Sequence, residues 1–137
     1  MFASEIQILI VDDMSAMRMR MSNQLKSIGF INIEQAENGQ EAFDKLEKMY
    51  TENKPVQLII SDWNMPIMSG LDFLQKVRTT ESYAKLPFVM VTAEGEKPQV
   101  IKALKSGVSD YLIKPVDKEL LQQKLLGVWN KLNTKTV

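Results

Sequence analysis

The sequence predicts a doubly wound α/β fold, in which five parallel strands alternate along the chain with five helices. Of five short apolar runs, four contain no strongly polar residue, which is typical of strands buried on both faces of a sheet. The stretches between these runs are longer, and their apolar residues recur at helical spacing. Because strand–helix–strand crossovers are right-handed, this alternation places helices on both faces of one sheet.

The expected strands are short, and most of them consist of branched aliphatic residues. The second strand has the weakest signal, because few of its residues carry the apolar pattern. The five runs are Ile8–Val11, Ile31–Ile33, Leu58–Ile60, Phe88–Val91 and Tyr111–Ile113.

The first two expected helices have recognisable ends. Gly29 follows the first helix as a stop signal, and Asn38 precedes the second as a cap, with Glu41 three residues later. Their apolar residues recur every three or four positions, so each helix has one face for the core. These residues are Met17, Met21, Leu25 and Ile28 in the first helix, and Ala42, Leu46 and Met49 in the second.

The last three helices have similar signals. Pro98 is expected in the first turn of the fourth helix, Gly107 after its end, and Asp117 as the cap of the fifth. We expect the apolar residues of all three helices to face the core. They are Leu71, Leu74 and Val77 in the third helix, Val100, Ile101 and Leu104 in the fourth, and Leu120, Leu121, Leu125 and Val128 in the fifth.

The chain has 137 residues, and we expect residues 1–137 to form a single domain that works as a monomer. No repeat, low-complexity segment or long linker divides the sequence. No apolar run approaches the ~20 residues that a membrane helix needs, and the first residues lack the pattern of a secretory signal. We therefore expect a cytoplasmic protein with no membrane partner.

The composition excludes several kinds of chemistry. Lys and Arg together number 17, as do Asp and Glu, so a net charge of zero gives no electrostatic reason to expect nucleic-acid binding. The absence of Cys and His excludes disulfides, Cys–His catalysis and metal sites made from these residues. Covalent chemistry is left to carboxylates, hydroxyls and lysines, and a metal site must consist of oxygen ligands.

Acidic residues follow two of the expected strands at the point where each strand ends. Asp12 and Asp13 follow the first strand, and Asp62 follows the third. In open parallel sheets, functional residues gather at the carboxyl ends of the strands. In a sheet of order 2-1-3-4-5 the first and third strands are neighbours, so the three carboxylates would share one pocket.

Thr92 and Lys114 follow the fourth and fifth strands, at the same edge of the sheet. Three carboxylates in one pocket repel each other, and a divalent cation and the Lys114 ammonium would offset that repulsion. Oxygen ligands favour Mg²⁺, which commonly bridges protein and phosphate. Asp62 can act as a nucleophile toward phosphorus, and the Thr92 hydroxyl can donate to a phosphoryl oxygen. The pattern predicts a phosphoryl-transfer site.

At these residues the sequence resembles the receiver domains of two-component response regulators. The stretch Ile8–Asp13 resembles their first strand and acidic pair, Asp62 their phosphoacceptor, and Thr92 and Lys114 their hydroxyl and lysine. The resemblance spans about residues 6–132 and implies a flavodoxin-like sheet of order 2-1-3-4-5.

Within this family, the resemblance is greatest to the stand-alone chemotaxis regulators. It rests on three stretches, Asp62–Pro66, Val91–Glu94 and Asp110–Pro115. The chain ends soon after the fifth expected helix, so we expect no DNA-binding output domain. The resemblance implies a signalling protein, not an enzyme, which catalyses only its own phosphorylation and dephosphorylation and acts by binding another protein.

The resemblance also implies a role for each residue around the metal. Asp13 and Asp62 would bind Mg²⁺ through their side chains and Asn64 through its backbone carbonyl, and Asp12 would support the ion. Asn64 and Glu94 would flank the path of the attacking water and tune dephosphorylation.

Lys114 would contact the phosphoryl group, and the peptide bond before Pro115 would be cis. Our hypothesis for the switch is that phosphorylated Asp62 draws the Thr92 hydroxyl inward, and that Tyr111 turns into the vacated space. This change would alter the face made by the fourth helix, the fifth strand and the fifth helix. The expected partners are a histidine kinase as phosphodonor and a protein target such as the flagellar motor switch, with a phosphatase as a further candidate.

Other interpretations stay open. A chemotaxis homologue that serves as a phosphate sink, or acts on a non-flagellar target, would differ only in its partner. A Mg²⁺-dependent phosphatase of the haloacid-dehalogenase type also forms an aspartyl phosphate, but its motif separates two Asp residues by one position, whereas Asp12 and Asp13 are adjacent. A scaffold that is never phosphorylated would not need the full set of acidic, hydroxyl and lysine residues.

Overall fold

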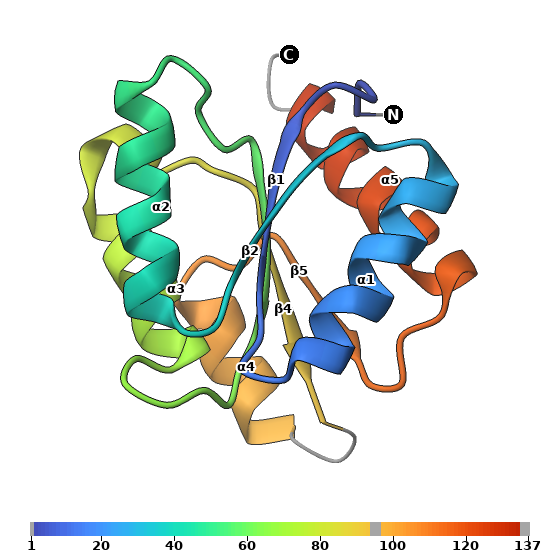
Figure 1. The fold of residues 1–137 in the computed structure, drawn as a ribbon. Coiled ribbons are helices and arrows are strands. Elements are labelled where there is room, and N and C mark those ends of the chain that lie inside the picture. Colours follow the sequence, from blue (N-terminus) through green and yellow to red (C-terminus); the bar gives the residue numbers. More distant parts are fainter. Residues whose placement is uncertain (1, 94–96, 135–137) are drawn as a thin grey trace.

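A computed structural model describes residues 2–93 and 97–134 as a five-stranded sheet between two layers of helices (Figure 1). The strands are β1 (Gln7–Val11), β2 (Asn32–Ala36), β3 (Leu58–Asp62), β4 (Phe88–Thr92) and β5 (Asp110–Ile113). The helices are α1 (Ser15–Ile28), α2 (Gly39–Thr51), α3 (Gly70–Thr79), α4 (Lys97–Lys105) and α5 (Lys118–Thr134), with a short 3₁₀ turn, η1 (Glu81–Tyr83), before β4. None of the helices in these two ranges is long and apolar enough to cross a membrane.

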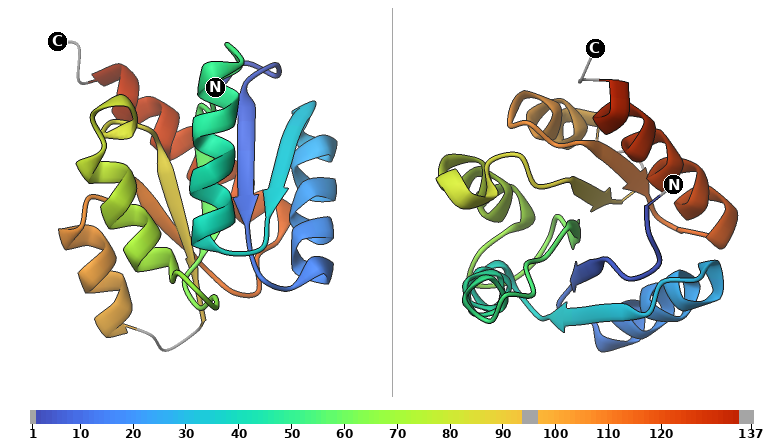
Figure 2. Two further views of the ribbon diagram at one scale, coloured as in Figure 1. Left: turned by 60° about the vertical axis from the view of Figure 1, so that its left-hand side comes forward. Right: turned by 90° about the horizontal axis from the view of Figure 1, so that it is seen from above.

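The strand order is β2-β1-β3-β4-β5, and every pair of neighbours is parallel. Helices α1 and α5 cover one face of the sheet, and α2, α3 and α4 cover the other (Figures 1 and 2). The prediction of a doubly wound sheet of order 2-1-3-4-5 is therefore confirmed. The register pairs Val11 with Ser61, Asp62 with Val91 and Thr92 with Ile113, so the carboxyl ends of four strands lie at one edge of the sheet.

The central strands are buried on both faces, as their unbroken apolar runs predict. All residues of β3 and β4 are buried. Successive side chains of a strand point to opposite faces of the sheet, so each strand contributes to two separate cores. The core under α2 and α3 includes Leu9, Val11, Ile59, Phe88 and Met90. The core under α1 and α5 includes Ile8, Ile10, Leu58, Ile60, Val89, Val91 and Leu112.

Two helix caps agree with the sequence patterns. The Asn38 side chain accepts a hydrogen bond from the Glu41 N–H at 2.9 Å. The Asp117 side chain accepts one from the Leu120 N–H at 2.7 Å. Both bonds satisfy backbone donors that a helix leaves unpaired in its first turn.

Two elements differ from their predictions. Strand β2 covers Asn32–Ala36, and Ile31 lies before it with 65% of its surface exposed. Among the described strands, β2 lies at the edge of the sheet and pairs with β1 alone, so it does not need the continuous apolar run of a central strand. In α4, Ile101 and Leu104 are each 54% exposed, whereas Ala103 is fully buried. The helix is oriented so that Ala103 faces the core between α4 and the sheet. The prediction that Ile101 and Leu104 face the core is therefore wrong.

The connection between β3 and α3 is a tight turn that depends on a glycine. The Gly70 N–H donates to the Trp63 carbonyl oxygen at 2.8 Å. A Cβ atom at Gly70 would lie 2.2 Å from the Asp62 carbonyl oxygen and 2.9 Å from the Trp63 Cα. Only glycine allows this approach, which fixes the end of β3 where Asp62 stands.

We expect Gly70→Ala to lower the free energy of unfolding by roughly 2–4 kcal/mol, because the backbone atoms that its Cβ meets cannot rotate away. The matched control is Gly127→Ala in α5, where a Cβ meets nothing within 4 Å. This control should raise the stability by about 1 kcal/mol, since alanine is the better helix former. Urea unfolding measures both changes. If Gly70→Ala were as stable as the wild type, the backbone of this turn would be able to shift and accommodate the Cβ atom.

Candidate functional site

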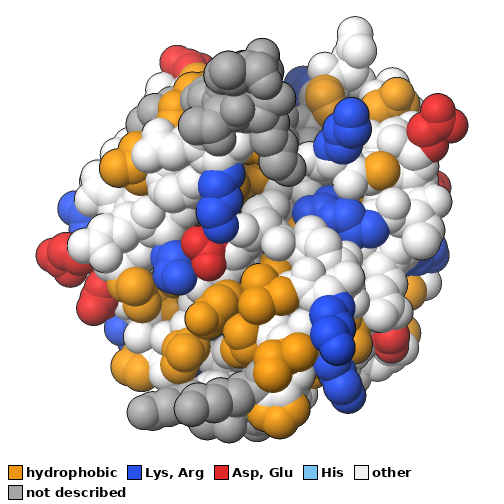
Figure 3. Space-filling model, turned by 180° about the vertical axis from the view of Figure 1, so that it is seen from behind, with side chains coloured by type: hydrophobic (Ala, Val, Ile, Leu, Met, Phe, Trp, Pro, Cys, Tyr) orange, Lys and Arg blue, Asp and Glu red, His pale blue; other side chains and the backbone are white. Residues whose placement is uncertain are grey.

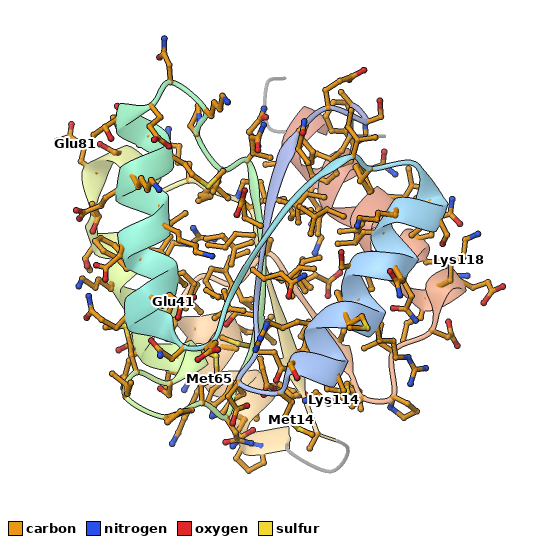
Figure 4. All side chains as sticks on the ribbon, in the orientation of Figure 1. Met14, Glu41, Met65, Glu81, Lys114 and Lys118 are labelled. Atoms are coloured by element: carbon orange, nitrogen blue, oxygen red, sulfur yellow. The ribbon has the colours of Figure 1, made fainter. Side chains whose placement is uncertain are left out.

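The site is a lysine between two buried carboxylates at the carboxyl edge of the sheet. The Lys114 Nζ lies 3.2 Å from Asp62 Oδ1 and 3.7 Å from Asp12 Oδ2. Asp12 and Asp62 are only 6% and 7% exposed. The strands bring these side chains together from positions far apart in the sequence, and Figure 4 labels Lys114 in the lower half of the molecule.

Asp13 completes an acidic cluster. Asp12, Asp13 and Asp62 each offer a carboxylate oxygen, and these three oxygens lie within 4.8 Å of one another. Asp13 is exposed, so it leaves the cluster open to solvent on one side. A set of hard carboxylate oxygens with an open side fits a small divalent cation that keeps part of its water shell.

Backbone donors hold the two buried carboxylates in place. The Met14 N–H donates to Asp12 Oδ1 at 2.9 Å, and the Trp63 N–H donates to Asp62 Oδ1 at 2.9 Å. The Arg18 Nη1 donates to the Asp12 carbonyl oxygen at 2.7 Å. Arg18 was not predicted to support the site, because nothing in its local sequence indicates a contact with a backbone carbonyl.

The electrostatics of the cluster favour an added cation. Burial raises the pKa of Asp62, and the charge of Asp12 raises it further, while Lys114 and the Trp63 N–H act in the opposite direction. Burial also raises the pKa of Asp12, against the Met14 N–H and Lys114. For both carboxyl groups the balance is a pKa above the ordinary value, so the Lys114 ammonium does not fully offset the burial and the repulsion between the carboxylates.

Thr92 and Tyr111 lie on the two strands beyond Asp62. Thr92 is 1% exposed, and its hydroxyl has no hydrogen-bond partner among the described residues. Tyr111 is half-buried on β5, where it packs against the core under α2 and α3. Its ring centre lies 4.8 Å from the Lys124 Nζ.

Asn64, Glu94 and the peptide bond before Pro115 are the remaining predicted features. Asn64 is exposed, two residues after Asp62. Glu94 lies outside the described residues. The peptide bond between Lys114 and Pro115 is cis, as the resemblance implies.

The fold and the acidic site together define a class of protein. The response regulator receiver domain model matches residues 8–126, and the chain belongs to this family. The resemblance seen in the sequence is therefore confirmed at the level of the family.

Similar proteins within the family are chemotaxis regulators named CheY. A chemotaxis protein CheY homolog of Campylobacter jejuni is 44% identical over 123 residues, which cover 90% of this chain and 92% of that protein. The structure of the chemotaxis response regulator CheY4 of Vibrio cholerae matches with a TM-score of 0.78 and 31% identity, covering 90% of this chain and 98% of that chain. A CheX–CheY–BeF₃–Mg²⁺ complex from Borrelia burgdorferi matches with a TM-score of 0.81 and 27% identity. The match covers 90% of this chain and 89% of the chain in that complex.

We expect Asp12→Asn to raise the Tm of the metal-free protein at pH 7 by roughly 2–5 °C, or about 1 kcal/mol. A raised pKa means that the charged form of Asp12 destabilises the folded chain above that pKa. The penalty disappears as the pH falls through the folded pKa toward 3.8, so the gain of the variant should shrink in that direction. The Asn amide oxygen can still accept the Met14 N–H, so the local hydrogen bond is kept.

Calorimetry in the presence of a chelator measures this difference. Glu34→Gln on β2 is the control, because Glu34 is exposed and should leave the Tm unchanged. A lower Tm for Asp12→Asn at pH 7 would mean that the ion pair with Lys114 outweighs the repulsion and the burial.

Proposed function

We propose that this protein is a phosphorylation-activated signalling switch, which accepts a phosphoryl group on Asp62 with Mg²⁺ as cofactor. The observation that carries the proposal is the position of the buried Asp62 carboxylate. Its Oδ1 contacts the Trp63 N–H and the Lys114 ammonium, and its Oδ2 accepts no hydrogen bond from the described residues. One oxygen is thus oriented, and the other is left to attack phosphorus.

The neighbouring residues supply what a phosphoryl transfer needs, namely position and positive charge. In the proposed step, a bond forms between an Asp62 oxygen and phosphorus while the bond from phosphorus to the donor's imidazole nitrogen breaks. Lys114 lies close enough to Asp62 to neutralise charge on the phosphoryl oxygens. The Thr92 hydroxyl is buried and has no hydrogen-bond partner in the part of the chain that the structure describes, so it is available to donate to one of these oxygens.

The three clustered carboxylates fit Mg²⁺, which when bound supplies further positive charge at the phosphoryl oxygens. Asp13 and Asp62 would hold the ion with their side chains and Asn64 with its backbone carbonyl, and Asp12 would support it. Asn64 and Glu94 would tune the rate at which water removes the phosphoryl group. The protein would catalyse only these two reactions on itself.

An apolar surface on α4 and β5 supports a protein target. Ile101 and Leu104 on α4 are each 54% exposed, and Ile113 on β5 is 41% exposed. Figure 3 shows the molecule from behind relative to Figure 1, and hydrophobic side chains gather in the lower half of this view. Tyr111 belongs to the same strand as Ile113 and is only half-buried, so a change of its rotamer would alter this surface.

The names of the relatives support a role in chemotaxis. We propose a histidine kinase as the phosphodonor and the flagellar motor switch as the target. The Borrelia complex supports the chemistry, since BeF₃ mimics a phosphoryl group and Mg²⁺ and a protein partner accompany it there.

We expect incubation with acetyl phosphate and Mg²⁺ to add one phosphoryl group to the protein. Asp62→Asn should gain none, and neither should the wild type in the presence of a chelator. Mass spectrometry of the intact protein after a rapid quench measures the addition. An adduct of the same size on Asp62→Asn would place the phosphoryl group elsewhere and refute the proposal.

We expect Thr92→Ala to keep most of the phosphorylation of Asp62 but to lose the response of the α4–β5 surface. The reason is that the buried hydroxyl is the group available to sense the phosphoryl oxygens. Methyl NMR of Ile101, Leu104 and Ile113, with and without beryllium fluoride and Mg²⁺, measures the response. Thr79→Ala on α3 is the control, and wild-type methyl shifts in Thr92→Ala would rule out this coupling.

A further inference from the structure

We propose that Gln24 on α1 is a positioning residue for Lys114, with Arg20 as a second donor to the same group. Gln24 would fix the backbone segment that carries Lys114, and so hold its ammonium beside Asp62. The inference rests on the proposed function, because it concerns how the same site is assembled.

The segment Lys114–Val116 is attached to the fold at both of its ends. At the first end, the Lys114 N–H donates to the Thr92 carbonyl oxygen at 2.8 Å. Pro115 follows and has no N–H to donate. At the other end, the Val116 carbonyl oxygen accepts from the Gln24 Nε2 at 2.9 Å and from the Arg20 Nη2 at 3.3 Å.

The same helix that holds Val116 also holds the acidic side of the site. Arg18 on α1 donates to the Asp12 carbonyl oxygen at 2.7 Å. Gln24 and Arg20 are four residues apart, which places them on one face of α1. Helix α1 therefore links the backbone at Asp12 to the backbone just beyond Lys114. Because the helix is rigid, it sets the distance between the Lys114 backbone and the carboxylates that its ammonium must reach.

Packing alone does not explain a glutamine at this position. The Gln24 Oε1 is buried and has no hydrogen-bond partner among the described residues. Gln24 lines a cavity of about 20 Å³ whose wall also includes Asp62, Lys114 and Val116. A buried acceptor without a partner is unfavourable, and an apolar side chain of the same length would avoid it. What the amide contributes is its N–H bond to the Val116 carbonyl.

A double-mutant cycle with Gln24→Met and Lys114→Met tests whether Gln24 acts through Lys114. The measurement is the rate of phosphorylation by acetyl phosphate with Mg²⁺, followed by intact mass. We expect Gln24→Met to slow the reaction at least fivefold in the wild-type background and to have no effect in the Lys114→Met background. Adding Arg20→Met should slow it further, because both side-chain donors that the described residues offer to the Val116 carbonyl are then lost.

A second measurement needs neither phosphate nor metal. With ¹³Cε-labelled lysine, the Lys114 signal of the metal-free protein is assigned by its loss in Lys114→Met. This signal should shift in Gln24→Met and stay in place in the control Asn23→Ala, an exposed neighbour on α1. The Tm of Gln24→Met should be unchanged or higher, since an unpartnered buried oxygen is removed.

The outcomes separate the inference from the proposed function. An equal slowing in both backgrounds, or a wild-type rate and an unmoved lysine signal in Gln24→Met, would overturn the positioning role. A wild-type protein that takes up no phosphoryl group would instead refute the proposed function. In that case the lysine signal of the metal-free protein alone would decide whether Gln24 positions Lys114.

Discussion

The ammonium of Lys114, held between the carboxylates of Asp12 and Asp62, is the interaction on which the site depends. Burying two carboxylates at one edge of a sheet is unfavourable unless a positive charge accompanies them. The parallel register makes this possible, because it places the ends of β1, β3 and β5 at the same edge. Burial nevertheless raises the pKa of both carboxyl groups, so their charged forms remain unfavourable in the pocket. A bound cation would offset this unfavourable charge.

The connection between β3 and α3, which follows Asp62, contains a close backbone contact and an unfavourable backbone conformation. Gly70 packs against the Asp62 carbonyl at a distance that no other residue permits. In the same connection Ile67 has a φ angle of 68° and is 83% exposed. A branched side chain rarely adopts such a backbone conformation, and its cost is of the order of 1–3 kcal/mol. The connection after Asp62 is thus not optimised for stability, and such departures are typical of functional segments.

The acidic cluster is consistent with the receiver-domain family, and we propose that the apolar surface on α4 and β5 binds the protein target. The site lies at one edge of the sheet, while the exposed apolar residues Ile101 and Ile113 lie on α4 and β5. Thr92 and Tyr111 lie on the two adjacent strands between these regions. Thr92 is fully enclosed and Tyr111 is half-buried, so a change near Asp62 would have a short path through packed side chains to the surface.

The sequence by itself determined the order of elements, the central strands and the residues at the strand ends, because these depend on local patterns. Unbroken apolar runs indicated β3 and β4, and Asn38 and Asp117 indicated two helix starts. The tertiary structure alone decided which face of α4 is buried, since Ala103 rather than Ile101 meets the sheet. It also decided the contacts of Arg18 and Gln24 with backbone carbonyls, the latter across 92 positions of the chain. A bond from a side chain to a distant backbone carbonyl leaves no local pattern, because any residue supplies that carbonyl.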